Sequence, residues 1–258
     1  MEQNSTARAA KWIRSLSMRT PWARWSPCVA LSMLLMGGAA QASDIKVTLT
    51  VDNSYALFYG SNQAATNFVG SDFNWTGAET YNFSLDSTKY LYVVTSSDLS
   101  VAQGFLGQFE NLSSGYKFYS SDPQWQVAAT GLGANAPYTG SSADVALLTQ
   151  QIDLANAGND ASNGWVNLTA GPANGSAPWG TIGGIDASAK WVWYSSNGDP
   201  DPTTPGYNHD EWLMFRIAVA ATPDNPVPSA PEPSTLVLAL AGLAGIGSVH
   251  KYGRKKSS

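Results

Sequence analysis

One acidic stretch, SNGDPDPTTPGYNHDE at residues 196–211, has the residue types best suited to holding a metal ion. It contains the carboxylates of Asp199, Asp201, Asp210 and Glu211. Calcium takes about six to eight oxygen ligands, and carboxylate-rich loops supply them. We therefore expect a calcium site on these four acids. The alternative is a solvated acidic loop whose prolines set its turns, and the order of the acids does not match an EF-hand.

Tryptophan is the second candidate for a binding function. An exposed indole can pack against the apolar face of a sugar ring, and seven tryptophans follow residue 42. Trp165 and Trp179 lie in loops rich in glycine and asparagine, so we expect both rings to be exposed and to contact a glycan. The other tryptophans are expected in the core, with Trp191 and Trp193, two positions apart, on one face of a strand.

The groups needed for nucleophilic or acid–base catalysis are scarce. The single cysteine is Cys28, and His209 is the one histidine between residues 43 and 230. No G-x-S-x-G, H-E-x-x-H or P-loop spacing occurs. We therefore expect no enzyme activity. The alternative is an extracellular hydrolase that acts on polysaccharide through two of the many carboxylates.

The elements that would position these residues are mostly short strands. Alternating, β-branched or aromatic segments are separated by clusters of glycine, asparagine, serine and proline, which predicts an all-β sandwich of two sheets. The segments span 45–51, 55–60, 80–85, 90–96, 105–111, 116–120, 125–129, 190–195 and 212–219. One helix is predicted over 142–156, with Ser142 as its cap and with Leu147, Leu148 and Ile152 on one face.

Residues 47–219 resemble galactose-binding-like jelly-roll domains. The resemblance rests on VTLTVDNSYALFYG, on the Trp-led segment that follows it, on Pro178-Trp179-Gly180, on Ala189 to Trp193 and on Phe215-Arg216. It implies a jelly roll of the carbohydrate-binding type. Because a fold does not determine a function, it does not imply that a sugar is bound.

The first 42 residues have the pattern of a secretory signal peptide. A basic segment leads into the apolar run CVALSMLLM, and Ala40-Gln41-Ala42 forms an A-x-A cleavage site that would make Ser43 the first mature residue. The run is too short to span a bilayer core of roughly 30 Å. Both Met1 and Met18 could serve as the start of translation.

The other end of the chain has three parts in a fixed order. Pro231-Glu232-Pro233 is followed by an apolar segment, expected to form a transmembrane helix over 234–250, and then by Lys251, Arg254, Lys255 and Lys256. Basic residues stay on the cytoplasmic side of a membrane. The arrangement resembles the PEP-CTERM sorting signal, which implies processing by an exosortase and an association with exopolysaccharide. A plain tail anchor is the alternative.

Charge is distributed unevenly along the chain. Residues 43–230 contain five basic side chains and 17 acidic ones, a net charge of −12, between two basic ends. An acidic body is repelled by phosphates, so nucleic acid is not expected as a partner.

The sequence thus predicts a signal peptide (1–42), a β-sandwich ectodomain (43–221), a proline-rich linker (222–230) and a sorting signal (231–258). The expected protein is exported, held briefly in the inner membrane and then placed at the cell surface as a matrix or glycan-associated component.

Overall fold

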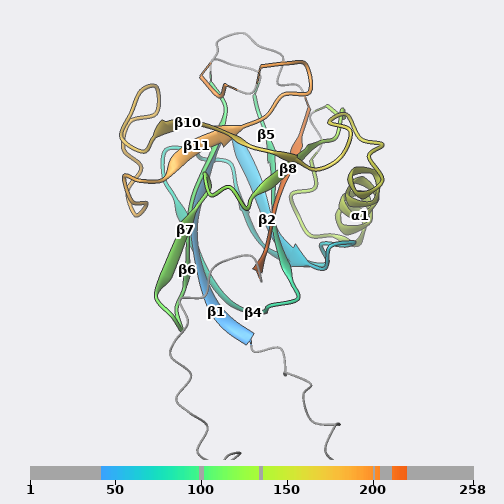
Figure 1. Ribbon diagram of the computed structural model, residues 1–258, viewed down its shortest axis with the longest axis horizontal. Coiled ribbons are helices and arrows are strands. Elements are labelled where there is room, and N and C mark those ends of the chain that lie inside the picture. The colour runs from blue at the N-terminus through green and yellow to red at the C-terminus, as the bar shows by residue number, and fades with distance from the viewer. Residues whose placement is uncertain (1–41, 99–101, 134–135, 200, 204–210, 220–258) are drawn as a thin grey trace, which may run out of the picture. The chain divides into compact units, whose positions relative to one another are not determined.

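The computed structural model describes residues 42–98, 102–133, 136–199, 201–203 and 211–219, which fold mainly into β-strands (Figure 1). The predicted signal peptide up to Gln41, the linker, the sorting motif, the apolar segment and the basic end lie outside these residues. The elements run in the order β1 (Ala42–Asp52), β2 (Ser54–Gly60), β3 (Asn67–Asp72), β4 (Glu79–Asp86), β5 (Tyr90–Ser96), β6 (Gly104–Asn111), β7 (Tyr116–Tyr119), β8 (Gln126–Ala129), α1 (Ser142–Asn156), β9 (Val166–Asn167), β10 (Thr169–Ala173), β11 (Lys190–Trp193) and β12 (Leu213–Ala218).

The strands form two six-stranded sheets in which every pair is antiparallel. The first sheet has the order β10-β11-β6-β1-β4, with β7 also paired to β6, and the second has the order β3-β2-β5-β12-β8-β9. The prediction of a mostly β protein with two sheets is confirmed. Among the described residues, no helix has the length and apolar character needed to cross a bilayer.

Three apolar clusters explain why many strands are buried on both faces. The side chains between the sheets include Val47 and Leu49 of β1 and Val93 of β5. The outer face of the second sheet packs against α1 through residues such as Leu148 and Ile152. The outer face of the first sheet is covered by the segment 174–189, which contributes Trp179, Ile182 and Ile185.

Helix α1 spans the predicted residues, but its cap is different from the predicted one. The side chain of Ser141 accepts a hydrogen bond from the backbone N–H of Asp144 (3.2 Å). Ser142 is the first helical residue, so its side chain is not at the position that can satisfy this N–H. Leu148 and Ile152 are buried as expected, while Leu147 is partly buried against the same cluster.

Both ends of the described body lie at the same end of the sandwich. Ala42, at the start of β1, pairs with Asp86, and Ala218, at the end of β12, pairs with Tyr90. Asp86 and Tyr90 flank the short turn between β4 and β5, where the N–H of Lys89 bonds to the carbonyl of Asp86 (3.1 Å). The opposite end of the sandwich contains Asp52, which pairs with the first residue of β6.

Candidate functional site

A pocket of about 220 Å³ lies at the end of the sandwich that is opposite to Ala42 and Ala218. We call it the acidic pocket, and it is lined by Asp52, Asn53, Trp75, Asp98, Ala102, Pro178 and Trp179. Strand β1 supplies Asp52 at its last residue, and the loop after β5 supplies Asp98. The pocket therefore brings together two carboxylates, an amide and two indoles from segments distant in sequence.

Asp52 is buried, with 7% of its surface exposed, because the segment 174–189 folds over the first sheet. The indole Nε1 of Trp179 donates a hydrogen bond to its Oδ2 (2.7 Å). No hydrogen bond from a described residue reaches its Oδ1. Loss of hydration raises the pKa of Asp52 to about 6, the hydrogen bond from Trp179 opposes that rise, and the charge of Asp98 adds to it.

The loop that carries Asp98 is held against the β1–β2 connection. The backbone N–H of Asp98 donates to Oδ1 of Asn53 (2.9 Å), and the N–H of Asn53 donates to the carbonyl of Ser96 (3.2 Å). These bonds place the second carboxylate at the mouth of the pocket, where Asp98 is exposed. One carboxylate is thus buried and the other is in contact with solvent.

Trp75 lines another wall of the pocket and is partly buried. Its carbonyl accepts a hydrogen bond from Oγ1 of Thr50 in β1 (3.0 Å). The preceding turn is fixed by side-chain bonds, because the N–H of Asn74 donates to Oδ2 of Asp72 (3.0 Å). This aromatic wall is therefore anchored to the first sheet.

Trp179 is held in place by its contacts on the first sheet. Its ring stacks on Trp191, with ring centroids 4.1 Å apart and planes at 19°. A Cβ atom at Gly104 would lie 2.6 Å from the ring of Trp191 and 3.2 Å from that of Trp179, so only glycine leaves room for this stack against β6. The expectation that Trp179 is exposed is wrong, since 7% of its surface is accessible and its accessible part faces the acidic pocket.

Asn174 organises the loop that carries Trp179. Its Nδ2 donates to the carbonyls of Ile182 (3.0 Å) and Ile185 (2.7 Å), and its Oδ1 accepts from the N–H of Ile182 (2.8 Å). The side chain is 6% exposed. A single amide thereby satisfies three backbone groups and closes the loop over the sheet.

Trp165 lies elsewhere, on the outer face of the second sheet, and is partly buried. The guanidinium carbon of Arg216 lies 3.7 Å from the centroid of its ring, and its Nε1 donates to Oδ1 of Asn156 (2.9 Å). Arg216 also donates from Nε and Nη2 to Oε1 of Gln126 (3.1 and 3.0 Å). One ring face of Trp165 is therefore covered by Arg216, and the structure does not bring Trp165 together with Trp179 in one pocket.

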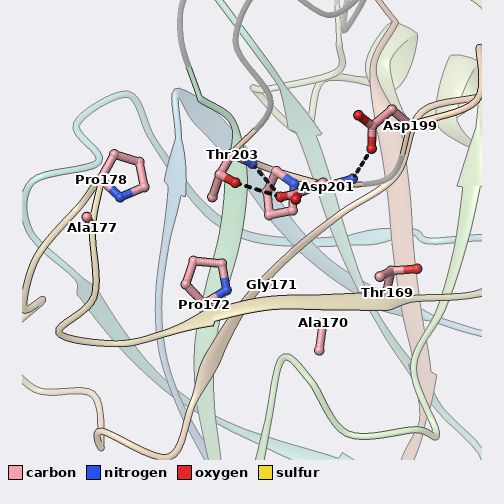
Figure 2. Close-up of a pocket in the computed structure, with 10 residues that line it drawn as sticks. Thr169, Ala170, Gly171, Pro172, Ala177, Pro178, Asp199, Asp201 and Thr203 are labelled. Atoms are coloured by element: carbon pink, nitrogen blue, oxygen red, sulfur yellow. Dashed lines mark hydrogen bonds between the residues drawn. The ribbon is translucent and has the colours of Figure 1, made fainter.

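A second hollow, which we call the proline groove, shares Pro178 with the acidic pocket. Figure 2 shows the residues that line this groove. Its volume is about 630 Å³, and it is lined by Thr169, Ala170, Gly171, Pro172, Ala177, Pro178, Asp199, Asp201, Pro202 and Thr203. Asp199 accepts a hydrogen bond from the N–H of Asp201 (2.9 Å), and Asp201 accepts from the N–H and hydroxyl of Thr203 (2.9 and 2.8 Å). These carboxylates stabilise their own turn.

The predicted calcium ligands do not form a ligand set in the described part of the chain. Asp199 and Asp201 share the proline groove, and Asp210 lies outside the described residues. Glu211 is 5% exposed, and its Oε1 and Oε2 accept from the N–H groups of Ser196 (2.9 Å) and Gly131 (3.0 Å). Glu211 is thus a structural acceptor between two loops, and no group of three or more His, Cys, Asp or Glu side chains suited to a metal occurs among the described residues.

Comparisons with protein families, with curated proteins and with solved structures returned no match to this chain. Four members of the acidic pocket, Asp52, Asn53, Trp75 and Asp98, were not singled out in the sequence. Asp52 ends a strong strand pattern next to Asn53, which is a typical turn signal, but nothing local indicates its burial.

Proposed function

We propose that this chain is an exported cell-surface protein of the PEP-CTERM class whose β-sandwich associates with glycan at the acidic pocket. The observation that supports glycan association is the buried carboxylate of Asp52 beside Trp75 and Trp179. Sugar rings offer hydroxyl donors and an apolar face of C–H groups. A carboxylate, an amide and an aromatic wall in one pocket complement both.

The proposed domain order is the one expected from the sequence. A signal peptide (1–42) precedes the ectodomain, for which a jelly roll of the galactose-binding-like type is the proposed topology. The sorting signal follows the linker, with Pro231-Glu232-Pro233 exposed outside the inner membrane and the residues from Lys251 to Lys256 inside. An exosortase then cuts near the motif and passes the body to the exopolysaccharide layer.

The glycan role can be tested with polysaccharide extracted from the producing cells. The full chain in a non-ionic detergent should sediment with that polysaccharide, and Trp75→Ala should reduce the bound fraction. Trp165→Ala, on the other sheet, is the matched control and should leave binding unchanged. Equal loss in both variants, or no binding by the unaltered chain, would refute a role for the pocket.

Sorting can be tested by fractionating cells and detecting the body and the C-terminal tail separately. The surface fraction should contain the body without the tail, and Glu232→Gln should retain the full-length form in the membrane. A tail that persists at the surface, unaffected by deletion of the exosortase, would support a plain tail anchor.

A second function is favoured by the same pocket. Burial raises the pKa of Asp52 to about 6, so this carboxyl group can carry a proton near that pH, and it lies with the carboxylate of Asp98 in one hollow. Glycoside hydrolases use such a pair as acid and base or nucleophile. Release of reducing ends from the extracted polysaccharide, abolished by Asp52→Asn and by Asp98→Asn separately, would establish the hydrolase.

A further inference from the structure

The acidic pocket combines negative charge with aromatic walls, and this combination selects a particular chemistry. Asp52 and Asp98 both line it, and no lysine or arginine belongs to its described lining. Carboxylates attract a cation, and indole rings attract a cation through the negative potential of their faces. A strongly hydrated metal ion gains little from indole, whereas an organic ammonium, which is partly apolar, gains from both groups.

One oxygen of Asp52 is available to such a cation. Its Oδ2 is used by Trp179, whereas its Oδ1 has no hydrogen-bond partner among the described residues although the side chain is more than nine-tenths buried. This oxygen is not one of the fully buried unpaired atoms of the described residues, so it opens onto the pocket and a ligand can reach it. An organic cation in the pocket would balance the charge of Asp52, and one that carries an N–H, such as a primary ammonium, would also donate a hydrogen bond to Oδ1.

The size of the pocket and the charge of the body agree with this chemistry. A volume of 220 Å³ corresponds to about seven water molecules, enough for an alkylammonium group or part of one sugar ring. The body carries a net charge of −12 over residues 43–230. Its field attracts a cationic ligand and repels an anionic one before contact is made.

We propose that the acidic pocket binds an organic ammonium group, with Asp52 as the charged acceptor and Trp75 and Trp179 as the aromatic walls. In a glycan this group is the amine of an amino sugar. That assignment rests on the glycan association proposed above and narrows it to polysaccharide with free amino groups. A small free ammonium compound is the other source of the same chemistry.

The test measures binding by calorimetry to the full chain in a non-ionic detergent at pH 7. The probes are a glucosamine tetramer, the N-acetylglucosamine tetramer with the same backbone but no charge, and choline. We expect the glucosamine tetramer to bind at least about tenfold more tightly than the acetylated one, and Asp52→Asn to abolish this preference. Asp199→Asn, which removes one carboxylate from the adjoining proline groove, is the control and should keep it.

Choline tests whether the ligand is a small ammonium compound and not an amino sugar. Because the charge of choline does not change with pH, any pH dependence of its binding comes from the protein. Binding of choline should weaken as the pH falls below about 6, where Asp52 takes up a proton in the empty pocket, and Asp98 is the other titratable group in the lining. Choline binding without binding of the glucosamine tetramer would support the ammonium site and assign it to a small ligand.

Two results would overturn the inference. If both tetramers bind equally, the pocket does not distinguish a free amino group from an acetylated one. The ammonium inference then fails, and the proposed glycan association is unaffected. If neither tetramer nor choline binds but the extracted polysaccharide still sediments with the chain, the ammonium inference fails and the glycan is recognised in another way. Asp98→Asn removes the other carboxylate of the lining and leaves Asp52 in place, so it should weaken the preference without abolishing it, and an unchanged preference in both Asp52→Asn and Asp98→Asn would refute the site.

Discussion

The indole Nε1 of Trp179 donates a 2.7 Å hydrogen bond to Oδ2 of Asp52, which lies 127 positions earlier in the chain. This bond joins the end of β1 to the loop that covers the outer face of the first sheet. It is the principal protein contact that favours the charged form of Asp52, against burial and the charge of Asp98. The pKa of Asp52 is therefore set by burial, by Trp179 and by Asp98, and Trp179 is the partner that ties this carboxylate to the covering loop.

Asp52→Asn should stabilise the protein at neutral pH. The pKa of Asp52 is raised from 3.8 to about 6 in the folded state, so the folded protein binds a proton more readily than the unfolded chain. Stability from this group is fully present below about pH 4 and is lost as the pH rises through 6, by roughly 3 kcal/mol at most. The free energy of unfolding, measured with denaturant at pH 5 and pH 7.5, should differ less between the two pH values in the variant than in the unaltered protein. The same difference in both proteins would contradict a raised pKa for Asp52.

Trp179→Phe should destabilise the protein at pH 7.5 by about 1.5–3 kcal/mol, because the charged acceptor loses its donor while a ring remains on Trp191. The pKa of Asp52 should then rise further above 6. The free energy of unfolding should be measured for both single variants and for Trp179→Phe combined with Asp52→Asn. If the two effects are additive, the hydrogen bond contributes nothing through Asp52.

The cap of helix α1 offers a matched comparison of two adjacent serines. Ser141→Ala removes the acceptor for the N–H of Asp144 and should cost about 1 kcal/mol. Ser142→Ala, at the first helical position, should change stability by less than about 0.5 kcal/mol. Thermal unfolding of both variants decides which serine caps the helix. A larger loss of stability in Ser142→Ala than in Ser141→Ala would identify Ser142 as the cap.

Glu211→Gln should destabilise the protein by about 2–3 kcal/mol, since an amide N–H₂ would replace an oxygen that accepts a backbone N–H. The loss should be the same in millimolar calcium and in chelator, because the carboxylate is used by Ser196 and Gly131. Melting curves under both conditions provide the measurement. A loss confined to calcium-containing buffer would return Glu211 to the calcium site.

The sequence predicted most of the strands because their signal is local. Segments such as TYNFSL and YLYVVTS alternate in the way that β4 and β5 require, and both fall inside observed strands. Strands β3, β9 and β10 were not predicted. They are short or contain glycine and proline, as in TAGPA of β10, and they exist because β2, β8 and β11 offer a partner edge.

The acidic pocket could not be predicted in the same way, because its parts meet only through tertiary structure. Glycine and asparagine around Trp179 indicated a loop, and loops are normally exposed. Asn174 and Gly104 reverse that expectation by closing the loop over the sheet and leaving room for two stacked indoles. The face-sharing prediction for Trp191 and Trp193 was also wrong, as Trp191 belongs to the outer cluster and Trp193 to the cluster between the sheets.

Ala42 and Ala218 lie at one end of the sandwich, and the acidic pocket lies at the other. Strand β1 has 11 residues and runs from the Ala42 end to the pocket end, a distance of roughly 33 Å. Ala42 and Ala218 are therefore at the end of the body that lies opposite the acidic pocket. A solid support or a fluorescent label coupled at Ala42 or Ala218 would thus be attached far from the pocket, which makes these positions suitable for immobilising the body in a binding assay.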